Sequence, residues 1–307
     1  MSFLILHSHT HAHGFWSQVG EAALHAFKDS LWSIPVLFIA YLLMELLERS
    51  RRLNESILHA YSRKAGPALG GILGVVPQCG ISGAAATLFS TGSISVGTML
   101  AVFFATSDEM LPVMLSSLSE GKGLTLGFIL LILLVKALMG ILLGYAADGI
   151  LNRWIRSHKD IHGFCHREHC DCDDDEGNVF LAALKHTLKI SLMLFAVTFA
   201  LELLFQFIGV ERLSGTILSK PVIGEAIVGL FGLIPNCSVS VVITESYLSG
   251  VISLGAMFSG LFANGGIGLL VLFRNNRNLK ENLAITAVLY GLSVLASVVI
   301  GLVASFF

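Results

Sequence analysis

Two adjacent carboxylates inside an apolar stretch are the side chains best suited to do chemistry. Asp108 and Glu109 follow Thr106 and Ser107 in the middle of the apolar residues 93–115. In a medium of low dielectric constant, two neighbouring carboxylates repel each other strongly unless a cation joins them. The pair therefore predicts a bound divalent cation, or one cation that exchanges with protons. The alternative is that the stretch ends early and the pair caps a helix in a headgroup region.

Two proline-containing segments with matching sequences supply further polar groups. Residues 71–82 and 229–240 share Gly, Gly, Pro, Cys and Ser at a constant offset of 158. Proline removes a backbone donor and clashes with the preceding turn, so each segment is predicted to interrupt an apolar helix. Gly74, Gly80 and Gly232 are expected to relax the backbone there. Because non-helical backbone deep in a membrane is buried or lines a cavity, these interruptions predict a binding site rather than kinks that only shape packing. The polar residues at the two tips are Gln78, Cys79, Asn236 and Cys237.

The same offset continues along the chain and predicts two homologous halves. Thr106 then corresponds to Asn264, and Asp108 to Gly266. One half would then supply carboxylates, and the other half would supply an amide and glycines that let the backbone come close. This asymmetry suits the binding of one ion near a pseudo-two-fold axis. Two repeats around a central site are typical of secondary transporters. The other repeated residues are Gly92, Ser95, Gly97 and Met99, which recur as Gly250, Ser253, Gly255 and Met257.

Further polar residues complete the candidate site. Thr244 and Glu245 follow the second proline segment, although Glu245 could instead lie near the membrane interface. Lys136 either extends to the membrane surface or neutralises a carboxylate. The two cysteines favour soft ions or serve packing alone, whereas carboxylates and amides favour hard ions, so the residue types leave the ion open. The candidate metal-binding residues are Asp108, Glu109, Gln78, Cys79, Asn236, Cys237, Glu245, Thr106, Ser107 and Asn264.

Two polar segments indicate metal binding independently of these spans. Histidines alternate in the N-terminal tail, and a loop of sequence HGFCHREHCDCDDDE runs from His162 to Glu176. Such tracts bind divalent metals loosely rather than in a closed site, and neither has the paired spacing of a structural zinc site. The alternative is a solvated linker. The accessory candidates are His7, His9, His11, His13, His162, Cys165, His166, His169, Cys170 and Cys172.

The composition requires a membrane to position these residues. Of 307 residues, 54% are hydrophobic and 13% are charged, and the mean hydropathy is +0.79. Soluble domains average about 25% charged residues, so a soluble enzyme and a disordered regulator are excluded. A net charge of -2 excludes a nucleic-acid binder. We expect an all-α polytopic membrane protein, whose apolar stretches are 30–48, 66–90, 93–115, 124–151, 180–208, 222–248, 250–273 and 282–306.

These stretches give a domain organisation with two membrane repeats. We expect a His-rich tail at 1–24, the first repeat at 25–151, a His/Cys/acidic loop at 152–178 and the second repeat at 179–307. If the two broken segments are re-entrant hairpins, slightly more of the loop Lys and Arg residues fall on one side of the membrane, and the positive-inside rule favours that topology. That topology makes the repeat inverted and brings the two tips toward each other.

The motifs resemble those of a known family. Pro77–Gly80, Ser107–Pro112, Pro235–Cys237 and residues 265–273 are similar to the ten-transmembrane heavy-metal exporters, named by analogy with arsenical permeases and also labelled manganese transporters. The resemblance covers about residues 25–306. It implies ten helices, if each hairpin arm counts as one, and metal efflux.

Together these observations predict a multi-pass secondary transporter of the inner (plasma) membrane that exports a divalent transition metal, manganese or another heavy metal, as a proton antiporter. Its partners would be the metal ion, protons and the lipid bilayer, with no nucleic acid and no resident cofactor; a homo-oligomer stays open. The first rival is efflux of a trivalent arsenical chelated by Cys79 and Cys237. An intramembrane enzyme is disfavoured because HExxH, GxSxG and dinucleotide motifs are absent from the sequence. A metal sensor using the polar loop is a third reading.

Overall fold

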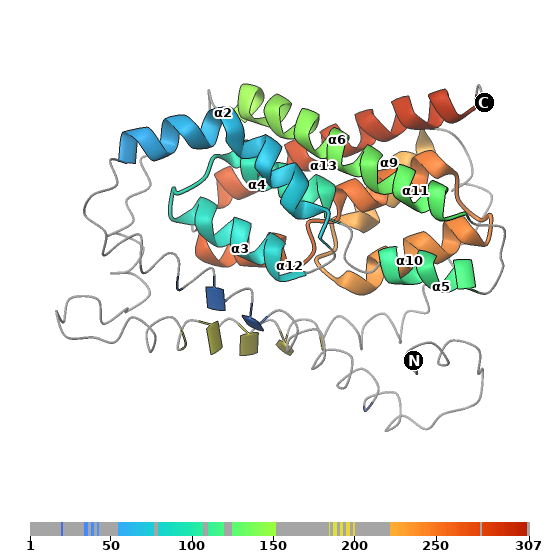
Figure 1. The fold of residues 1–307 in the computed structure, drawn as a ribbon, viewed down its shortest axis with the longest axis horizontal. Coiled ribbons are helices and arrows are strands. Elements are labelled where there is room, and N and C mark those ends of the chain that lie inside the picture. Colours follow the sequence, from blue (N-terminus) through green and yellow to red (C-terminus); the bar gives the residue numbers. More distant parts are fainter. Residues whose placement is uncertain are drawn as a thin grey trace.

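The computed structural model describes residues 55–76, 79–106, 110–119, 125–151, 222–276 and 278–305, with single positions between 20 and 42 and between 184 and 199. These segments are helical and contain no strand, as expected (Figure 1). The helices are α2 (Glu55–Gly74), α3 (Cys79–Ser90), α4 (Val96–Ala105), α5 (Met110–Ser119), α6 (Leu126–Leu151), α9 (Ile223–Gly232), α10 (Cys237–Leu248), α11 (Leu254–Ala263), α12 (Ile267–Asn275) and α13 (Leu279–Ala304).

Four of the described helical segments are long and apolar enough to cross a membrane. Two are the uninterrupted helices α6 and α13, of 26 residues each. The other two are Val96–Leu118, which joins α4 to α5 across the undescribed residues 107–109, and Leu254–Asn275, which joins α11 to α12. Four apolar spans of this length are typical of a membrane protein.

The described residues do not support the ten helices that the family resemblance implies. The expected stretches 66–90 and 222–248 are each divided at the proline into two short apolar helices of 10 to 17 residues. A helix of that length is too short to cross a bilayer alone. The expected stretches 30–48 and 180–208 lie almost entirely outside the described residues.

The uninterrupted helices lie outside and the interrupted ones inside. In α6 and α13 only 28% of the apolar window is buried, against 73% in Val96–Leu118 and 89% in Leu254–Asn275. Leu130, Leu134, Leu138 and Leu142 form an exposed row along α6 at a spacing of four residues. Such a row on a helix that spans a membrane is a surface for lipid. The interrupted spans therefore form the interior of the molecule.

Glycines let the inner helices approach the outer ones closely. α4 packs against α2 and α6, and α11 packs against α9 and α13. A Cβ on Gly140 of α6 would lie 3.0 Å from the Ala101 carbonyl oxygen, and one on Gly144 would lie 2.7 Å from the Ala101 Cβ. Small residues four positions apart are the usual way in which membrane helices reach such contact.

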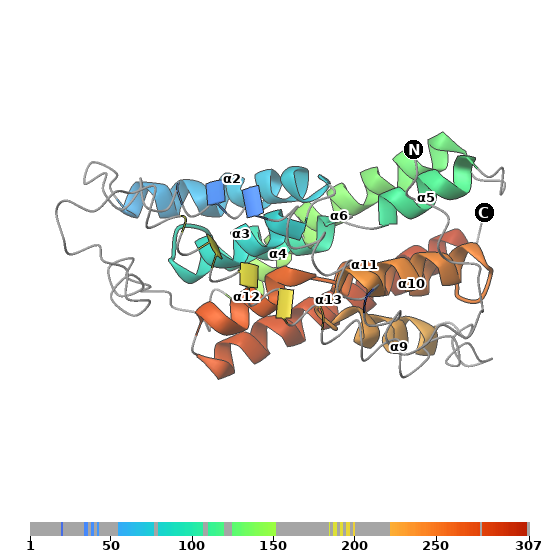
Figure 2. The ribbon, with the colours of Figure 1, turned by 90° about the horizontal axis from the view of Figure 1, so that it is seen from below.

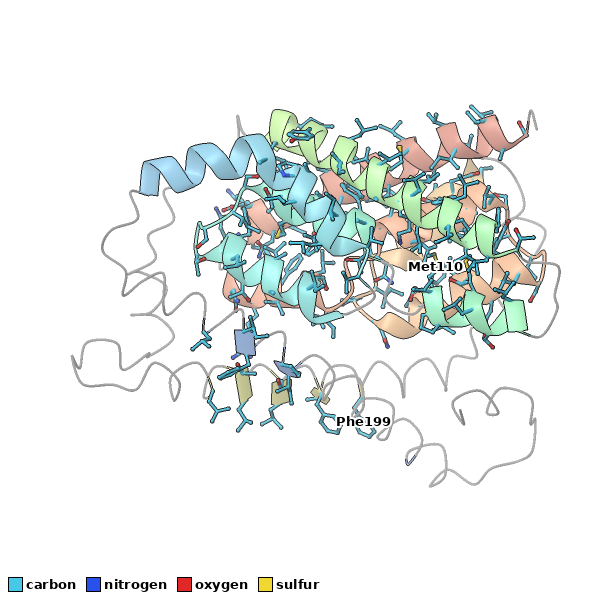
Figure 3. All side chains as sticks on the ribbon, viewed as in Figure 1. Met110 and Phe199 are labelled. Atoms are coloured by element: carbon cyan, nitrogen blue, oxygen red, sulfur yellow. The ribbon has the colours of Figure 1, made fainter. Side chains whose placement is uncertain are left out.

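Helices from the two halves of the chain also pack against each other. α12 packs against α3, and α10 packs against α5. Asn275 at the end of α12 donates a hydrogen bond to the Thr87 hydroxyl of α3 at 3.4 Å. Seen from below, α2–α6 lie in the upper part of the molecule and α9–α13 in the lower part (Figure 2). Side chains fill the space between them, and Met110, the first residue of α5, is fully buried (Figure 3).

Residues that recur in the sequence have the same local role in both halves. Gly92 and Gly250 have φ of 83° and 73°, which glycine adopts without strain, and each lies in the turn before an inner helix. Ser95 and Ser253 cap α4 and α11, because their hydroxyls accept hydrogen bonds from the amides of Thr98 and Ala256.

Candidate functional site

Within each half, the break at the proline lies beside the end of the inner helix. A Cβ on Gly74, the last residue of α2, would lie 2.7 Å from the Val102 carbonyl oxygen in the final turn of α4. The equivalent Gly232 ends α9 and would overlap the Gly260 carbonyl of α11 if it carried a Cβ. Gly74 and Gly232 end their helices without a positive φ. What these glycines provide in the structure is room for α2 and α9 to approach the inner helices closely.

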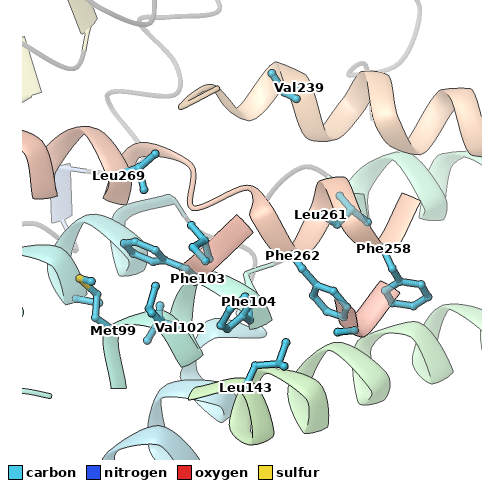
Figure 4. Close-up of a cluster of buried hydrophobic side chains, with 14 of the residues drawn as sticks. Met99, Val102, Phe103, Phe104, Leu143, Val239, Phe258, Leu261, Phe262 and Leu269 are labelled. Atoms are coloured by element: carbon cyan, nitrogen blue, oxygen red, sulfur yellow. The ribbon is translucent and has the colours of Figure 1, made fainter. Parts of the chain in front are cut away.

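Across the halves, the inner helices meet end to end. Phe104 and Phe262 are fully buried and form a T-shaped pair with ring centroids 6.4 Å apart. Figure 4 shows α4 and α11 approaching this pair from opposite directions. The Phe258 ring is tilted by 34° against that of Phe262, with centroids 5.4 Å apart. Thr106 and Asn264, the C-cap residues, each follow two positions after these rings. The carboxyl ends of two half-spans therefore meet in the interior.

A second contact ties the break of one half to the helix of the other. A Cβ on Gly265 would lie 3.0 Å from the Phe103 ring, and one on Gly268 would lie 2.7 Å from the Ser82 carbonyl oxygen. The segment between α11 and α12 is thus pressed against α3 and α4. A side chain at Gly268 would overlap the backbone of α3, and one at Gly265 would press on the Phe103 ring.

Hydrogen bonds within the chain define both C-caps. The amide and hydroxyl of Thr106 donate to the Val102 carbonyl at 2.9 and 2.7 Å. The Asn264 side-chain oxygen accepts from the Gly266 amide at 2.9 Å. Gly266, with φ of 51°, starts α12 in a conformation that favours glycine. Both side chains keep an oxygen lone pair beyond these bonds, so they remain suitable as cation ligands.

Lys136 brings a positive charge to the first of these ends. It lies near the middle of α6 with 0% of its surface exposed, so it does not extend to the membrane surface. Its ammonium donates a hydrogen bond to the Thr106 carbonyl oxygen. The carbonyls at a helix C-terminus carry partial negative charge, which stabilises a cation there. The same position of α13, ten residues after its start, is the buried Leu289.

Two acidic residues, the half-buried Asp148 and the buried Glu225, lie at the opposite ends of the inner helices. Asp148 accepts hydrogen bonds from the Ser95 hydroxyl at 2.9 Å and the Gly97 amide at 2.7 Å, at the start of α4. Glu225 is 3% exposed, and its Oε1 would lie 2.6 Å from a Cβ on Gly255, at the start of α11. Its Oε2 has no hydrogen-bond partner. Sequence analysis did not single out these residues, although an ionisable residue in an apolar stretch is a sufficient signal.

Three of the predicted site residues lie at the helix ends described above. Thr106 and Asn264 each follow a ring of the Phe104–Phe262 pair by two positions, and Asn236, 1% exposed, lies in the break that follows Gly232. Glu245 is exposed on α10, where no described contact joins it to that centre. Cys79 and Cys237 are the first residues of α3 and α10.

The remaining candidates lie outside the described residues. These are Gln78, Ser107, Asp108, Glu109, His7, His9, His11, His13, His162, Cys165, His166, His169, Cys170 and Cys172. Among the residues that the structure does describe, no group of three or more His, Cys, Asp or Glu side chains is arranged to hold a metal ion. The described part of the site consists of amide, hydroxyl and backbone groups with one ammonium.

Comparison of the chain with protein-family models, curated proteins and solved structures finds no match. The resemblance to heavy-metal exporters therefore continues to rest on the sequence motifs alone.

Proposed function

We propose that the chain is a secondary transporter that exports a divalent transition-metal cation in exchange for protons. The observation that carries the proposal is the end-to-end meeting of α4 and α11, whose C-caps Thr106 and Asn264 lie in the buried interior. Discontinuous helices that end near the bilayer midplane are the usual ion sites of secondary transporters, because unwound carbonyls and helix C-termini coordinate cations.

The anionic ligands in this proposal are Asp108 and Glu109. They follow the C-cap Thr106 by two and three positions, so chain connectivity limits their distance from it. Two carboxylates at an interior helix end need positive charge, which either one divalent cation or protons supply. Alternation between these two states couples export of metal to entry of protons. Asn236 and Asn264 would add neutral oxygen ligands from the second half, and Gln78 one from the first.

An inverted repeat would explain how the site opens to either side. The helix bounds of α3 and α10, and of α4 and α11, agree at the sequence offset of 158. α4 and α11 approach each other from opposite directions, and α6 and α13 run in opposite directions (Figures 1 and 4). Both observations support a two-fold relation between the halves, with its axis in the plane of the membrane. In transporters built this way, one repeat moves against the other around a fixed site. We place the protein in the inner membrane.

Growth of a knockout strain on a panel of metals tests the proposal. The wild-type chain should restore resistance to at least one divalent metal, and Asp108→Asn should not restore it at equal expression. Glu281→Gln is the matched loss of a carboxylate at the start of α13, away from the meeting point, and it should complement fully. If sensitivity to every metal is the same with and without the wild-type chain, the proposal fails.

The same strain separates metal export from arsenical export. Two thiolates can chelate a trivalent arsenical, whereas carboxylates have little affinity for it. If Cys79→Ser and Cys237→Ser abolish resistance to arsenite or methylarsenite while Asp108→Asn retains it, the substrate is an arsenical and the metal proposal is wrong.

A further inference from the structure

Glu225 has a carboxyl oxygen without a partner in the interior of the molecule. The residue lies in the first turn of α9 with 3% of its surface exposed, and its Oε2 has no hydrogen-bond partner. A buried carboxylate oxygen without a hydrogen bond is costly, and an ionisable residue in an apolar part of a membrane protein is by default a functional candidate. The unpaired oxygen therefore indicates a ligand that the carboxyl group binds.

Three helices meet around this carboxyl group. Its Oε1 lies 2.6 Å from the position that a Cβ on Gly255 of α11 would take, and 3.3 Å from the position of a Cβ on Gly301 of α13. The Ser297 carbonyl oxygen of α13 lies 3.1 Å from the same position at Gly255. A carboxylate and a carbonyl oxygen are both acceptors, so an ionised Glu225 gains nothing from Ser297, whereas a protonated one is able to donate to it. The neighbours of Glu225 thus suit a carboxyl group that carries a proton.

The first half of the chain places a carboxyl group at the start of its inner helix in a different way. Asp148 has the position in α6 that Gly301 has in α13, and its two oxygens accept hydrogen bonds from the Ser95 hydroxyl and the Gly97 amide. Such bonds are expected of an ionised carboxylate at a helix N-terminus. Each inner helix thus begins beside one carboxyl group, but of the two it is Glu225 that leaves an oxygen without a partner.

The described helices that pack on α9 place no cation beside Glu225. These helices are α10, α11 and α13, and their ionisable residues are Glu245, Tyr247, Lys280, Glu281 and Tyr290. The Tyr290 hydroxyl reaches α9 and donates to the Ala226 carbonyl. Lys280 is the one cation among them, and it lies about 30 Å along α13 from Gly301. On these helices, a proton is therefore the positive charge that Glu225 can gain.

α9 connects this carboxyl group to the proposed metal site. At the start of α9, Glu225 lies against Gly255 at the start of α11. At the end of α9, Gly232 lies against Gly260 in the last turn of α11, and Asn236 is in the break that follows. An anion is attracted to the amides at the start of a helix, so protonation of Glu225 weakens the hold of α9 on α11. A shift of α9 then moves Asn236.

We propose that Glu225 is a proton-binding site of the exchange, separate from the metal site at the ends of the inner helices. The proposal rests on the proposed function and adds the group that takes up a proton when the metal leaves. A proton that binds to Oε2 turns the carboxylate into a neutral acid, whose O–H donates to a neighbouring carbonyl. Because linkage is reciprocal, a proton on Glu225 lowers the affinity for the metal, and a bound metal favours release of the proton.

Infrared difference spectroscopy of the purified chain detects this proton directly. A protonated carboxyl group has a C=O stretching band that an ionised carboxylate lacks. We expect a band of the wild-type chain that disappears in Glu225→Gln and decreases when Mn²⁺ or Zn²⁺ is added. Glu281→Gln, the matched loss of a carboxylate at the start of α13, should keep the band. Glu225→Ala is the second neutral variant if Glu225→Gln does not fold. If neither substitution removes a carboxyl band, Glu225 carries no proton and the inference is wrong.

The number of protons released on metal binding separates a proton site from a structural carboxylate. In weakly buffered detergent solution with a pH indicator, the wild-type chain should release about one proton more per bound metal ion than Glu225→Gln. Glu225→Gln should also bind the metal about tenfold more weakly, with an affinity that varies less with pH. A merely structural Glu225 would lower the melting temperature and leave the proton count unchanged.

The outcomes distinguish this inference from the proposed function. If the wild-type chain binds Mn²⁺ or Zn²⁺ with release of protons, and the folded Glu225→Gln variant releases as many, only this inference is wrong. If the wild-type chain binds neither ion, or transports one without a counterflow of protons, the proposed function fails for these ions. The infrared band of Glu225 still decides in that case whether the residue binds a proton.

Discussion

The contact of Gly232 with the last turn of α11 gives the sharpest prediction about how the fold holds the site. In Gly232→Ala, the new Cβ would overlap the Gly260 carbonyl oxygen and lie 2.9 Å from its carbonyl carbon. The obstacle is backbone, and the same carbonyl accepts the Asn264 amide at 3.0 Å, so it cannot turn away without loss of that bond. Inserting a methyl group into such a packed contact costs about 1–3 kcal/mol.

A matched substitution isolates this steric cost from the intrinsic effect of replacing glycine by alanine in a helix. A Cβ on Gly291, inside α13, meets nothing within 4 Å. Gly291→Ala should therefore stabilise the protein by about 0.5–1 kcal/mol through the unfolded state and helix propensity. The equivalent contact in the first half is slightly looser, since a Cβ on Gly74 would lie 2.7 Å from the Val102 carbonyl oxygen. The expected order of stability is Gly291→Ala, then Gly74→Ala, then Gly232→Ala.

Thermal unfolding of the purified chain in detergent, followed by circular dichroism, measures this order. Metal affinity measured on the same samples should fall for Gly232→Ala, because separation of α9 from α11 moves Asn236 relative to Asn264. Gly291→Ala should keep wild-type affinity. A Gly232→Ala protein as stable as Gly291→Ala, with unchanged metal binding, would refute the argument that this contact positions the site.

Three further predictions concern other parts of the molecule. A double-mutant cycle with Phe104→Leu and Phe262→Leu should give a coupling energy of about 0.5–1.5 kcal/mol in thermal unfolding, and additive effects would show that the ring pair does not join the halves. Asp148→Ala should lower stability by about 1–2 kcal/mol, since the start of α4 loses two hydrogen bonds, while metal affinity stays at the wild-type value. Deletion of residues 160–176 should lower the number of metal ions bound in equilibrium dialysis but leave transport intact, and loss of transport would place that loop in the pathway.

Much of the architecture could be predicted because membrane burial leaves a strong signal in composition. The proline segments were correctly predicted to interrupt helices: α2 ends at Gly74 and α9 at Gly232, and the next helices begin at Cys79 and Cys237. Because proline lacks a backbone hydrogen-bond donor, the interruption of the helix is a local effect that the sequence alone predicts. The recurrence of Ser95 and Ser253 is visible in the sequence, but their capping role depends on the Thr98 and Ala256 amides beside them.

The breaks after Ala105 and Ala263 could not be predicted from hydropathy. Both lie inside continuous apolar sequence, and only one contains a carboxylate, so a hydropathy pattern reads each as a single span. The place of Lys136 was also open, because its sequence neighbours are apolar whether it reaches the membrane surface or the interior. Tertiary contact with Thr106 decides that question. The roles of Gly74 and Gly232 depend likewise on a helix distant in sequence.

The most direct measurement of the central claim is transport by the purified chain in liposomes, with a panel of divalent metals and an imposed pH gradient. We predict that a divalent metal moves across the membrane only with a counterflow of protons, that dissipation of the pH gradient slows it, and that Asp108→Asn abolishes it. If no divalent metal moves under any gradient, or if the Asp108→Asn variant transports as well as the wild type, the interior site between α4 and α11 is not a proton-coupled metal site.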